Sequence, residues 1–197
     1  MRTIAVLPVK AFEHAKTRLA TDLGLPQPEL AAQMAGGVLR ALCASERVER
    51  VLVVTRERSA MDLADELGAE IVQEEELRGH SAAAMLGVAR AVEHQAERVL
   101  LAAGDCPLLT SADVDDLLAR HTEPGVVILT DRHGTGTNGL LLTPPTAIAP
   151  SFGMGSRERH AEIAHHSGVP WTVESIPAFA IDVDTADDLA AVRAATP

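Results

Sequence analysis

Residues 98–121, RVLLAAGDCPLLTSADVDDLLARH, contain the repeating unit that decides the fold. The apolar run Arg98–Ala103 has the length and composition of a strand that is buried on both faces. After the small segment GDCP, Thr110 is a suitable N-terminal cap for an amphipathic stretch, Ser111–His121, with Asp113 in its first turn. The stretch therefore predicts a strand followed by a helix.

The same alternation of short apolar runs and amphipathic stretches continues along the whole chain. Further strands are predicted at Thr3–Val9, Arg50–Thr55, Ala69–Gln73, Gly125–Thr130, Gly139–Thr143 and Phe179–Val183. Further helices are predicted at Glu29–Ala44, Ser59–Leu67, Ser81–His94, Ser156–Ser167 and Ala186–Ala195. This pattern is typical of an α/β three-layer sandwich around a mainly parallel, mixed sheet. Because 197 residues without repeats or linkers suit one core, we expect a single domain spanning residues 1–197.

The regular alternation is interrupted between Asp131 and Ser156, in a segment rich in Gly and Pro. Its Asn138-Gly139 pair is a candidate tight turn between two strands. Residues 134–139 also spell G-x-G-x-x-G, but strand residues follow where a dinucleotide-binding loop requires a helix. We therefore reject a dinucleotide site and expect functional residues in this interruption.

The composition excludes several functional classes. The 28 Asp and Glu against 17 Lys and Arg leave a formal net charge of -11, which disfavours nucleic acids and anionic membranes as partners. Aromatic residues make up 2%, too few to build base-stacking platforms. The two cysteines form neither a disulfide framework nor a zinc cluster, and no signal peptide or membrane span is recognisable. We therefore expect a cytoplasmic protein.

The basic residues are unevenly distributed. Fifteen of the 17 are Arg, and both lysines, Lys10 and Lys16, follow the first predicted strand. With Arg2 and Arg18 they give the first twenty residues four cations against one Glu, a local balance of +3 in an acidic chain. A genome that favours Arg codons would also leave few lysines, so the count alone leaves a special role for these ammonium groups open.

Charged side chains follow the ends of several predicted strands, which is where ligands bind in open α/β sheets. Lys10 follows the first strand, Asp105 follows the strand at Arg98–Ala103, and Asp182 and Asp184 end the last strand. Carboxylates at one edge suit Mg²⁺ bound to substrate phosphates, so the pattern indicates phosphoryl or nucleotidyl transfer. The two C-terminal aspartates could equally cap the final helix, and their spacing leaves both interpretations open.

Cysteine and histidine supply weaker candidates. Cys106 has no obvious base beside it, which favours a small buried thiol over a nucleophile. His160, His165 and His166 share one predicted helix, but their spacings do not match a helical zinc pair, and we expect the latter two to be solvated. His160 follows the loop Phe152–Ser156, whose glycines and helix N-terminus suit an anion.

Taken in order, these motifs resemble those of a known family. They are PVK at 8–10, AKTRL at 15–19, GDCPLL at 104–109, GTN at 136–138, FGMGS at 152–156 with His160 after it, IDVDT at 181–185 and DDL at 187–189. Over nearly its whole length the chain resembles the 2-phospholactate/phosphoenolpyruvate guanylyltransferases of deazaflavin coenzyme F-420 biosynthesis. The resemblance implies a nucleotide-diphospho-sugar-transferase-like fold. It also implies transfer of GMP from GTP to the phosphate of phosphoenolpyruvate or 2-phospho-L-lactate, with release of pyrophosphate.

The resemblance also implies roles for individual residues and Mg²⁺ as the cofactor. The implied metal ligands are Asp105, Asp182 and Asp184. The implied catalytic groups are Asp105 and the triphosphate-binding Lys10, Lys16 and Arg18. The implied nucleotide-binding residues are Leu7, Pro8, Val9, Lys10, Lys16, Gly79 and Ser81. A small phosphorylated three-carbon acid would contact Thr137, Asn138, Gly153, Gly155, Ser156 and His160. Its phosphate, with a second pKa of about 6, is already largely dianionic at neutral pH and needs no general base.

One segment departs from the family pattern. Gly79-His80-Ser81 stands where the family has Gly-Leu-Asn at the start of the third helix, in a region that faces the nucleotide. Ser81 could still cap that helix and offer a hydroxyl. The alternatives are a molybdopterin guanylyltransferase or cytidylyltransferase of the same fold, and a non-catalytic nucleotide-binding paralogue. The sequence does not separate phosphoenolpyruvate, 2-phospholactate and phosphoglycerate, and it leaves the oligomeric state open.

Overall fold

A computed structural model describes residues 1–10, 12, 27–74, 79–183, 187, 188, 190 and 192. Among these residues, seven strands form one sheet in the order β3-β2-β1-β4-β6-β5-β7. The strands are β1 Thr3–Val9, β2 Arg50–Thr55, β3 Glu70–Gln73, β4 Arg98–Ala102, β5 Gly125–Thr130, β6 Thr137–Thr143 and β7 Trp171–Glu174. The helices are α2 Gln27–Cys43, α3 Arg58–Leu67, α4 His80–Glu93, α5 Ser111–Arg120, α6 Ser156–His166 and α7 Pro177–Ala180.

The sheet is mixed and mainly parallel, as the sequence predicts. Strands β3, β2, β1 and β4 run parallel, and β5 runs parallel to β7. Only β6, among the described strands, is antiparallel to its neighbours β4 and β5. The short connection between β5 and β6 permits this reversal, whereas parallel neighbours need long crossovers such as α3 and α4.

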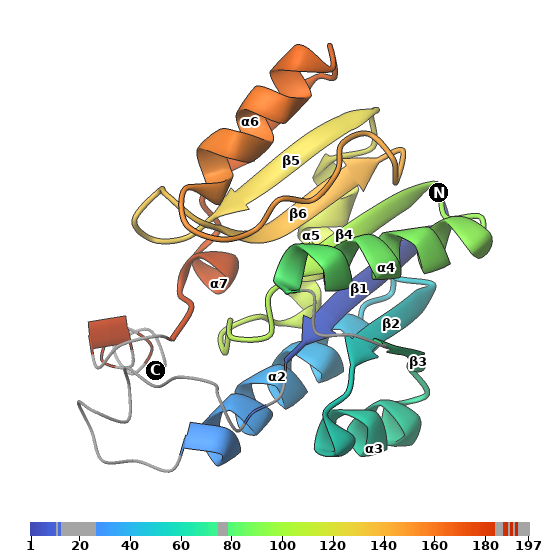
Figure 1. Cartoon of the computed structure of the whole chain (residues 1–197), viewed down its shortest axis with the longest axis vertical. Helices are drawn as coiled ribbons and strands as arrows, with labels where there is room; N and C mark the ends of the chain where they lie inside the picture. The colour runs from blue at the N-terminus through green and yellow to red at the C-terminus, as the bar shows by residue number, and fades with distance from the viewer. Residues whose placement is uncertain are drawn as a thin grey trace.

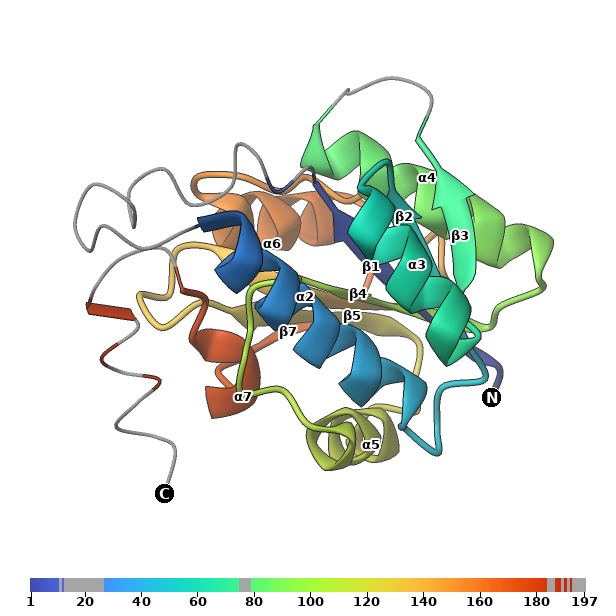
Figure 2. The same ribbon diagram turned by 90° about the horizontal axis from the view of Figure 1, so that it is seen from below.

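Helices cover both faces of the sheet (Figures 1 and 2). Helices α2, α3, α5 and α7 pack on one face, and α4 and α6 pack on the other. In β1, Leu7 and Val9 enter the first core, whereas Ile4 and Val6 enter the second. Burial on both faces explains why the strands are continuously apolar, and it confirms the predicted three-layer sandwich. None of the described helices has the length and apolar composition needed to span a membrane.

The region near the C-terminus differs from the prediction. Residues 179–183 form no strand: Pro177–Ala180 is the short helix α7, and the buried Phe179 packs in the core from it. Pro at the first helical position favours this start. The strand of this region is β7 instead. It lies at the edge of the sheet, where Trp171 is 44% exposed, so it lacks the continuous apolar run by which buried strands are recognised in a sequence. The predicted helix Ala186–Ala195 lies largely outside the described residues.

The prediction of a tight turn at Asn138-Gly139 is also wrong. Both residues belong to β6, and the chain reverses within residues 131–136 instead. There the Asp131 carboxylate accepts the Thr135 backbone N–H at 2.8 Å. A Cβ at position 139 would lie 2.7 Å from Leu129 Cδ1 and 3.2 Å from Phe179 Cδ1, so close packing explains this glycine.

Close packing also fixes Gly87, where α4 crosses β1 and β2. A Cβ added there would lie 2.2 Å from Val6 Cγ1 and 3.0 Å from Val54 Cγ2, both buried side chains. We expect Gly87→Ala to lower the free energy of unfolding by about 1–3 kcal/mol because it overpacks the core. Urea-induced unfolding monitored by circular dichroism measures the change.

The matched control is Gly37→Ala in α2, where nothing among the described residues lies within 4 Å of the added Cβ. That variant should gain up to about 1 kcal/mol from helix propensity. Equal stabilities of the two alanine variants would contradict the packing explanation.

Candidate active site

A cavity of about 1060 Å³ opens at the carboxyl ends of β1 and β4. The antiparallel β6 begins at this same edge, because Ala102 of β4 is paired with Gly139 of β6 and Ala103 donates its N–H to the Asn138 carbonyl at 2.8 Å. The start of α4 and the loop before α6 complete the walls. The position agrees with the rule that open α/β sheets bind ligands beyond their strand ends.

Most of the predicted site residues that the structure describes line this cavity. They are Pro8, Val9, Lys10, Ser81, Asp105, Thr137, Asn138, Gly153, Gly155, Ser156 and Asp182. Leu7 is instead fully buried in the core, Gly79 immediately precedes α4, and His160 lies behind the wall, in contact with Thr137. Lys16, Arg18 and Asp184 lie outside the described residues.

The cavity also includes residues to which the sequence analysis assigned no role. Among them are His80, Asp131 and Phe152. Asp131 directly follows β5 and opens the segment that the search of strand ends reached, but it was assigned no role. His80 lies within the segment that departs from the family pattern, and Phe152 opens a motif of which only the later residues were assigned roles.

Asp105, which follows β4, and Asp182, which follows α7, both line the cavity. The backbone N–H of Val183 donates to the carbonyl of Asp105 at 3.2 Å, which ties the two segments together. The side-chain amide of Asn138 donates to Asp182 Oδ1 at 3.1 Å and to the Phe179 carbonyl at 2.9 Å. Asn138 therefore positions Asp182 at the cavity.

The carboxylate pair fits one kind of metal site. Within the described residues, no group of three or more His, Cys, Asp or Glu side chains is placed to hold an ion. Mg²⁺ normally takes one or two carboxylates together with waters and substrate phosphates, rather than an all-protein cage. Asp105 and Asp182 therefore fit a Mg²⁺ ion that is shared with a bound polyphosphate.

The opposite wall is suited to an anion. Gly153 and Gly155 have φ angles of 116° and 70°, values that favour glycine, and Gly155 caps the N-terminus of α6. The guanidinium of Arg159 donates to the Ser151 and Phe152 carbonyls at 3.1 and 3.3 Å and holds this loop in place. Because a helix N-terminus carries partial positive charge, the wall favours negatively charged groups.

The start of α4 closes one side of the cavity. Burial, together with the positive charge of nearby Lys10, lowers the pKa of His80 to about 4 against the opposing effect of Asp105. His80 is therefore uncharged at pH 7. Lys10 is then the one positively charged side chain among the described residues that line the cavity. The prediction that Ser81 caps the helix is wrong, because Gly79 is the cap and the Ser81 hydroxyl accepts the Phe152 N–H at 2.8 Å.

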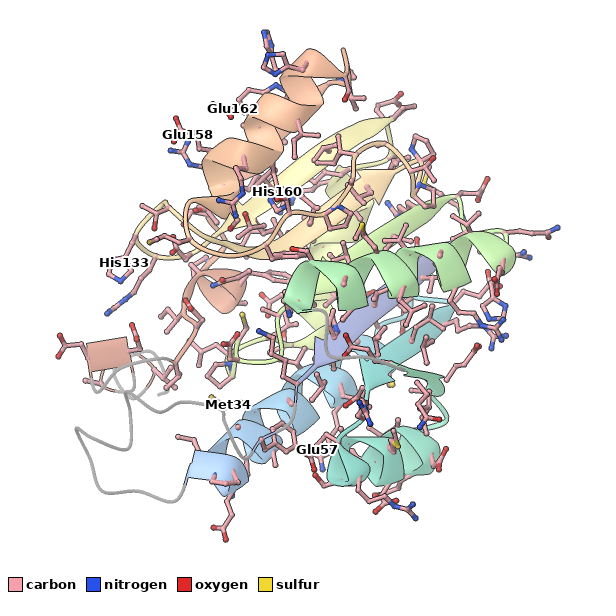
Figure 3. The ribbon with its side chains drawn as sticks, in the orientation of Figure 1. Met34, Glu57, His133, Glu158, His160 and Glu162 are labelled. Atoms are coloured by element: carbon pink, nitrogen blue, oxygen red, sulfur yellow. The ribbon has the colours of Figure 1, made fainter. Side chains whose placement is uncertain are left out.

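His160 differs from the other histidines of α6. Its side chain is fully buried and points toward the sheet, whereas Glu158 and Glu162 point away (Figure 3). Burial and the Arg159 charge lower its pKa to about 4. His165 and His166 are exposed, as predicted. The buried thiol predicted for Cys106 is also confirmed, since its Sγ donates to the Phe179 carbonyl at 3.4 Å.

The chain is similar to known proteins over almost its whole length. Residues 3–193 match the model of the family described as "Guanylyl transferase CofC like". A phosphoenolpyruvate guanylyltransferase from Conexibacter woesei is 46% identical, over 98% of this chain and 88% of the relative. A 2-phospho-L-lactate guanylyltransferase from Methanothermobacter thermautotrophicus is 35% identical, over 96% of this chain and 83% of the relative.

A solved structure supports the fold independently. The crystal structure of a candidate nucleotide-diphospho-sugar transferase from Desulfovibrio desulfuricans G20 superposes with a TM-score of 0.78. The superposition covers 98% of this chain and 87% of the chain from Desulfovibrio desulfuricans, and the two sequences are 16% identical. The nucleotide-diphospho-sugar-transferase-like fold implied by the sequence is therefore confirmed.

The buried His160 gives the folded state a defined pH dependence. Its pKa is about 4 in the folded protein and near 6.5 when the chain is unfolded. Between these values the unfolded state binds more protons, so the free energy of unfolding falls as the pH falls. We expect His160→Asn to flatten this dependence by at most about 1.4 kcal/mol per pH unit. Urea-induced unfolding at several pH values between 4 and 7 measures it.

The control is His165→Asn, which changes an exposed imidazole of the same helix and should keep the parent slope. His80, whose pKa is also lowered to about 4, contributes to the slope of every variant. Parent and His160→Asn curves of the same steepness would refute the expectation.

Proposed function

This chain belongs to the family of CofC-like guanylyl transferases, and from that premise we propose that it transfers GMP from GTP to a small phosphorylated acid in coenzyme F-420 biosynthesis. The acid is phosphoenolpyruvate or 2-phospho-L-lactate, and pyrophosphate is the second product. The observation that carries the proposal is the convergence of Lys10, Asp105, Asp182 and the N-terminus of α6 on one cavity. These groups supply the charge neutralisation and anion binding that nucleotidyl transfer requires.

In this proposal the triphosphate binds along the end of β1, beside Lys10, and its further ligands are Lys16 and Arg18. Asp105, Asp182 and Asp184 would hold Mg²⁺. The ion, when bound, neutralises charge on the triphosphate and on departing pyrophosphate. Ser81 and the backbone of Pro8 and Val9 line the same side of the cavity and suit the nucleoside.

The phosphorylated acid binds at the opposite wall, against Thr137, Gly153 and Ser156. One of its phosphate oxygens attacks the α-phosphorus of GTP, a new P–O bond forms, and the bond to the bridging oxygen of the β-phosphate breaks. The nucleophile has a second pKa of about 6 and is largely dianionic at neutral pH. The chain therefore positions and neutralises charge, and no side chain has to remove a proton.

Phosphoenolpyruvate is our first choice of acid. The Conexibacter woesei relative, 46% identical, carries that activity in its name, whereas the phospholactate enzyme from Methanothermobacter thermautotrophicus is 35% identical. Phosphoenolpyruvate and 2-phospholactate differ in one double bond, and 3-phosphoglycerate has a hydroxyl on C2 and its phosphate on C3, so changes in the wall near Thr137 would decide among them.

Pyrophosphate release by the purified chain tests the proposed reaction. The four common nucleoside triphosphates should be combined with phosphoenolpyruvate, 2-phospholactate and 3-phosphoglycerate. We expect turnover with GTP and phosphoenolpyruvate. Turnover with a sugar 1-phosphate or molybdopterin in place of every phospho acid would favour the cytidylyltransferase or molybdopterin alternatives, and calorimetric GTP binding without product would favour a non-catalytic paralogue.

The metal assignment predicts the effect of Asp105→Asn. Loss of this carboxylate should reduce kcat by at least about 100-fold, because charge at the transferred phosphorus is no longer neutralised. The thermal unfolding midpoint should stay close to that of the parent. Asp62→Asn is the matched control, since Asp62 is an exposed α3 residue paired with Arg58 at 3.0 Å, and it should keep full activity. Parent activity in Asp105→Asn would remove the metal assignment.

A further inference from the structure

The imidazole of His160 joins two walls of the cavity. Its Nε2 lies 2.8 Å from the backbone nitrogen of Ser151, in the loop before α6. Its Nδ1 lies 3.1 Å from the Thr137 hydroxyl at the start of β6. The side chain of Thr137 is 7% exposed and lines the cavity, whereas His160 is shielded from it completely. One buried ring therefore links the loop that carries Gly153 to the strand that carries Thr137.

The chemistry of these partners fixes the direction of each hydrogen bond. A backbone N–H can only donate, so Nε2 must accept from Ser151 and cannot carry a proton. The buried ring is neutral at pH 7, since its pKa is about 4. Its single proton therefore lies on Nδ1 and is donated to Thr137 Oγ1.

The direction of that bond determines what the Thr137 hydroxyl can offer. A hydroxyl has one proton and two lone pairs, and the Nδ1–H occupies one lone pair. Within the part of the chain that the structure describes, His160 is the one hydrogen-bond partner of this hydroxyl. The hydroxyl proton is therefore left to donate toward the cavity.

Resting on the proposed function, we propose that His160 is a positioning residue that fixes the Thr137 hydroxyl as a donor to an anionic oxygen of the phosphorylated acid. The group it selects accepts hydrogen bonds and donates none, as a carboxylate or a fully ionised phosphate does. A neutral hydroxyl or amide in the same place gains less, because hydrogen bonds to charged acceptors are the stronger ones. The relay runs from the Ser151 N–H through His160 to Thr137 and then to the ligand.

The surroundings of the ring keep it in this orientation. Phe152 packs edge-on against His160, with ring centroids 5.3 Å apart, and His80 packs on Phe152 at 4.8 Å. Arg159, the charged neighbour that lowers the pKa of His160, is itself bound to loop carbonyls. The relay is thus built into the same packing that shapes the anion-binding loop.

The tautomer of His160 is the first test, and it needs no substrate. Two-dimensional ¹H–¹⁵N spectra of the imidazole nitrogens, recorded on the full chain at pH 7, distinguish a protonated Nδ1 from a protonated Nε2. The His160 signals are identified among the eight histidines by their loss in His160→Phe. We expect the proton on Nδ1. A proton on Nε2, or on both nitrogens, would overturn the relay even if the enzyme is fully active.

Steady-state kinetics provide the second test. His160→Phe keeps a planar ring but no nitrogen, and should raise the KM for phosphoenolpyruvate by roughly 10- to 100-fold while the KM for GTP stays within about twofold. His160→Asn, whose amide can donate from near the Nδ1 position, should recover most of the loss. His165→Phe on the exposed side of α6 is the control and should match the parent.

A double-mutant cycle shows whether His160 acts through Thr137. Thr137→Val removes the hydroxyl at constant shape, and adding His160→Phe to it should cause no further rise in the KM for phosphoenolpyruvate. The proposal would be overturned if the two substitutions raised the KM for phosphoenolpyruvate independently, so that their fold-changes multiplied in the double variant. An equal rise in the KM for GTP would also overturn it. If no phospho acid supports turnover in the parent, the proposed function fails, and the tautomer measurement still decides the relay by itself.

Discussion

The pairing of β6 with β4 is the constraint on which the site depends. Parallel strands bring the residues after β1 and β4 to one edge of the sheet, and this places Lys10 and Asp105 there. An antiparallel strand inserted beside β4 starts at that edge, so Thr137 and Asn138 arrive from the opposite chain direction. A fully parallel sheet would have carried these two residues to the far end of the strand. The reversal thus combines a cation, carboxylates and neutral donors in one cavity.

The walls of the cavity are held in place by polar side chains that form hydrogen bonds to the residues lining it. Asn138 positions Asp182, Ser81 binds the backbone of Phe152, and His160 joins Ser151 to Thr137. Each contact joins different segments of the chain, and all but that of His160 with Ser151 span more than 20 residues. Buried polar groups must be paired to be tolerated, so these contacts give the irregular segment between β6 and α6 a defined shape. A wall of fixed shape suits the recognition of a small acid such as the one in the proposed function.

The negative net charge of the chain does not exclude an anionic ligand at this site. A net charge of -11 disfavours long polyanions, yet the described cavity combines Lys10 with three aspartates and a helix N-terminus. Under the proposed function, a compact triphosphate that shares Mg²⁺ with Asp105 and Asp182 would satisfy both signs of charge. The neutral donors of the α6 wall would then bind the phosphorylated acid without a further Lys or Arg, because oriented N–H and O–H dipoles suffice at short range.

The sequence by itself determined the layers, the mainly parallel sheet and many of the residues that line the cavity, because apolar periodicity and strand-end positions are local signals. It failed for Phe179–Val183 and for Asn138-Gly139, where a buried Phe179 against Gly139 overrides the local strand and turn preferences. The tertiary structure alone decided the partners of Asn138, Ser81 and His160. A hydrogen bond between residues 23 positions apart, such as that of Thr137 with His160, has no sequence signature, since only the folded backbone brings its atoms within reach.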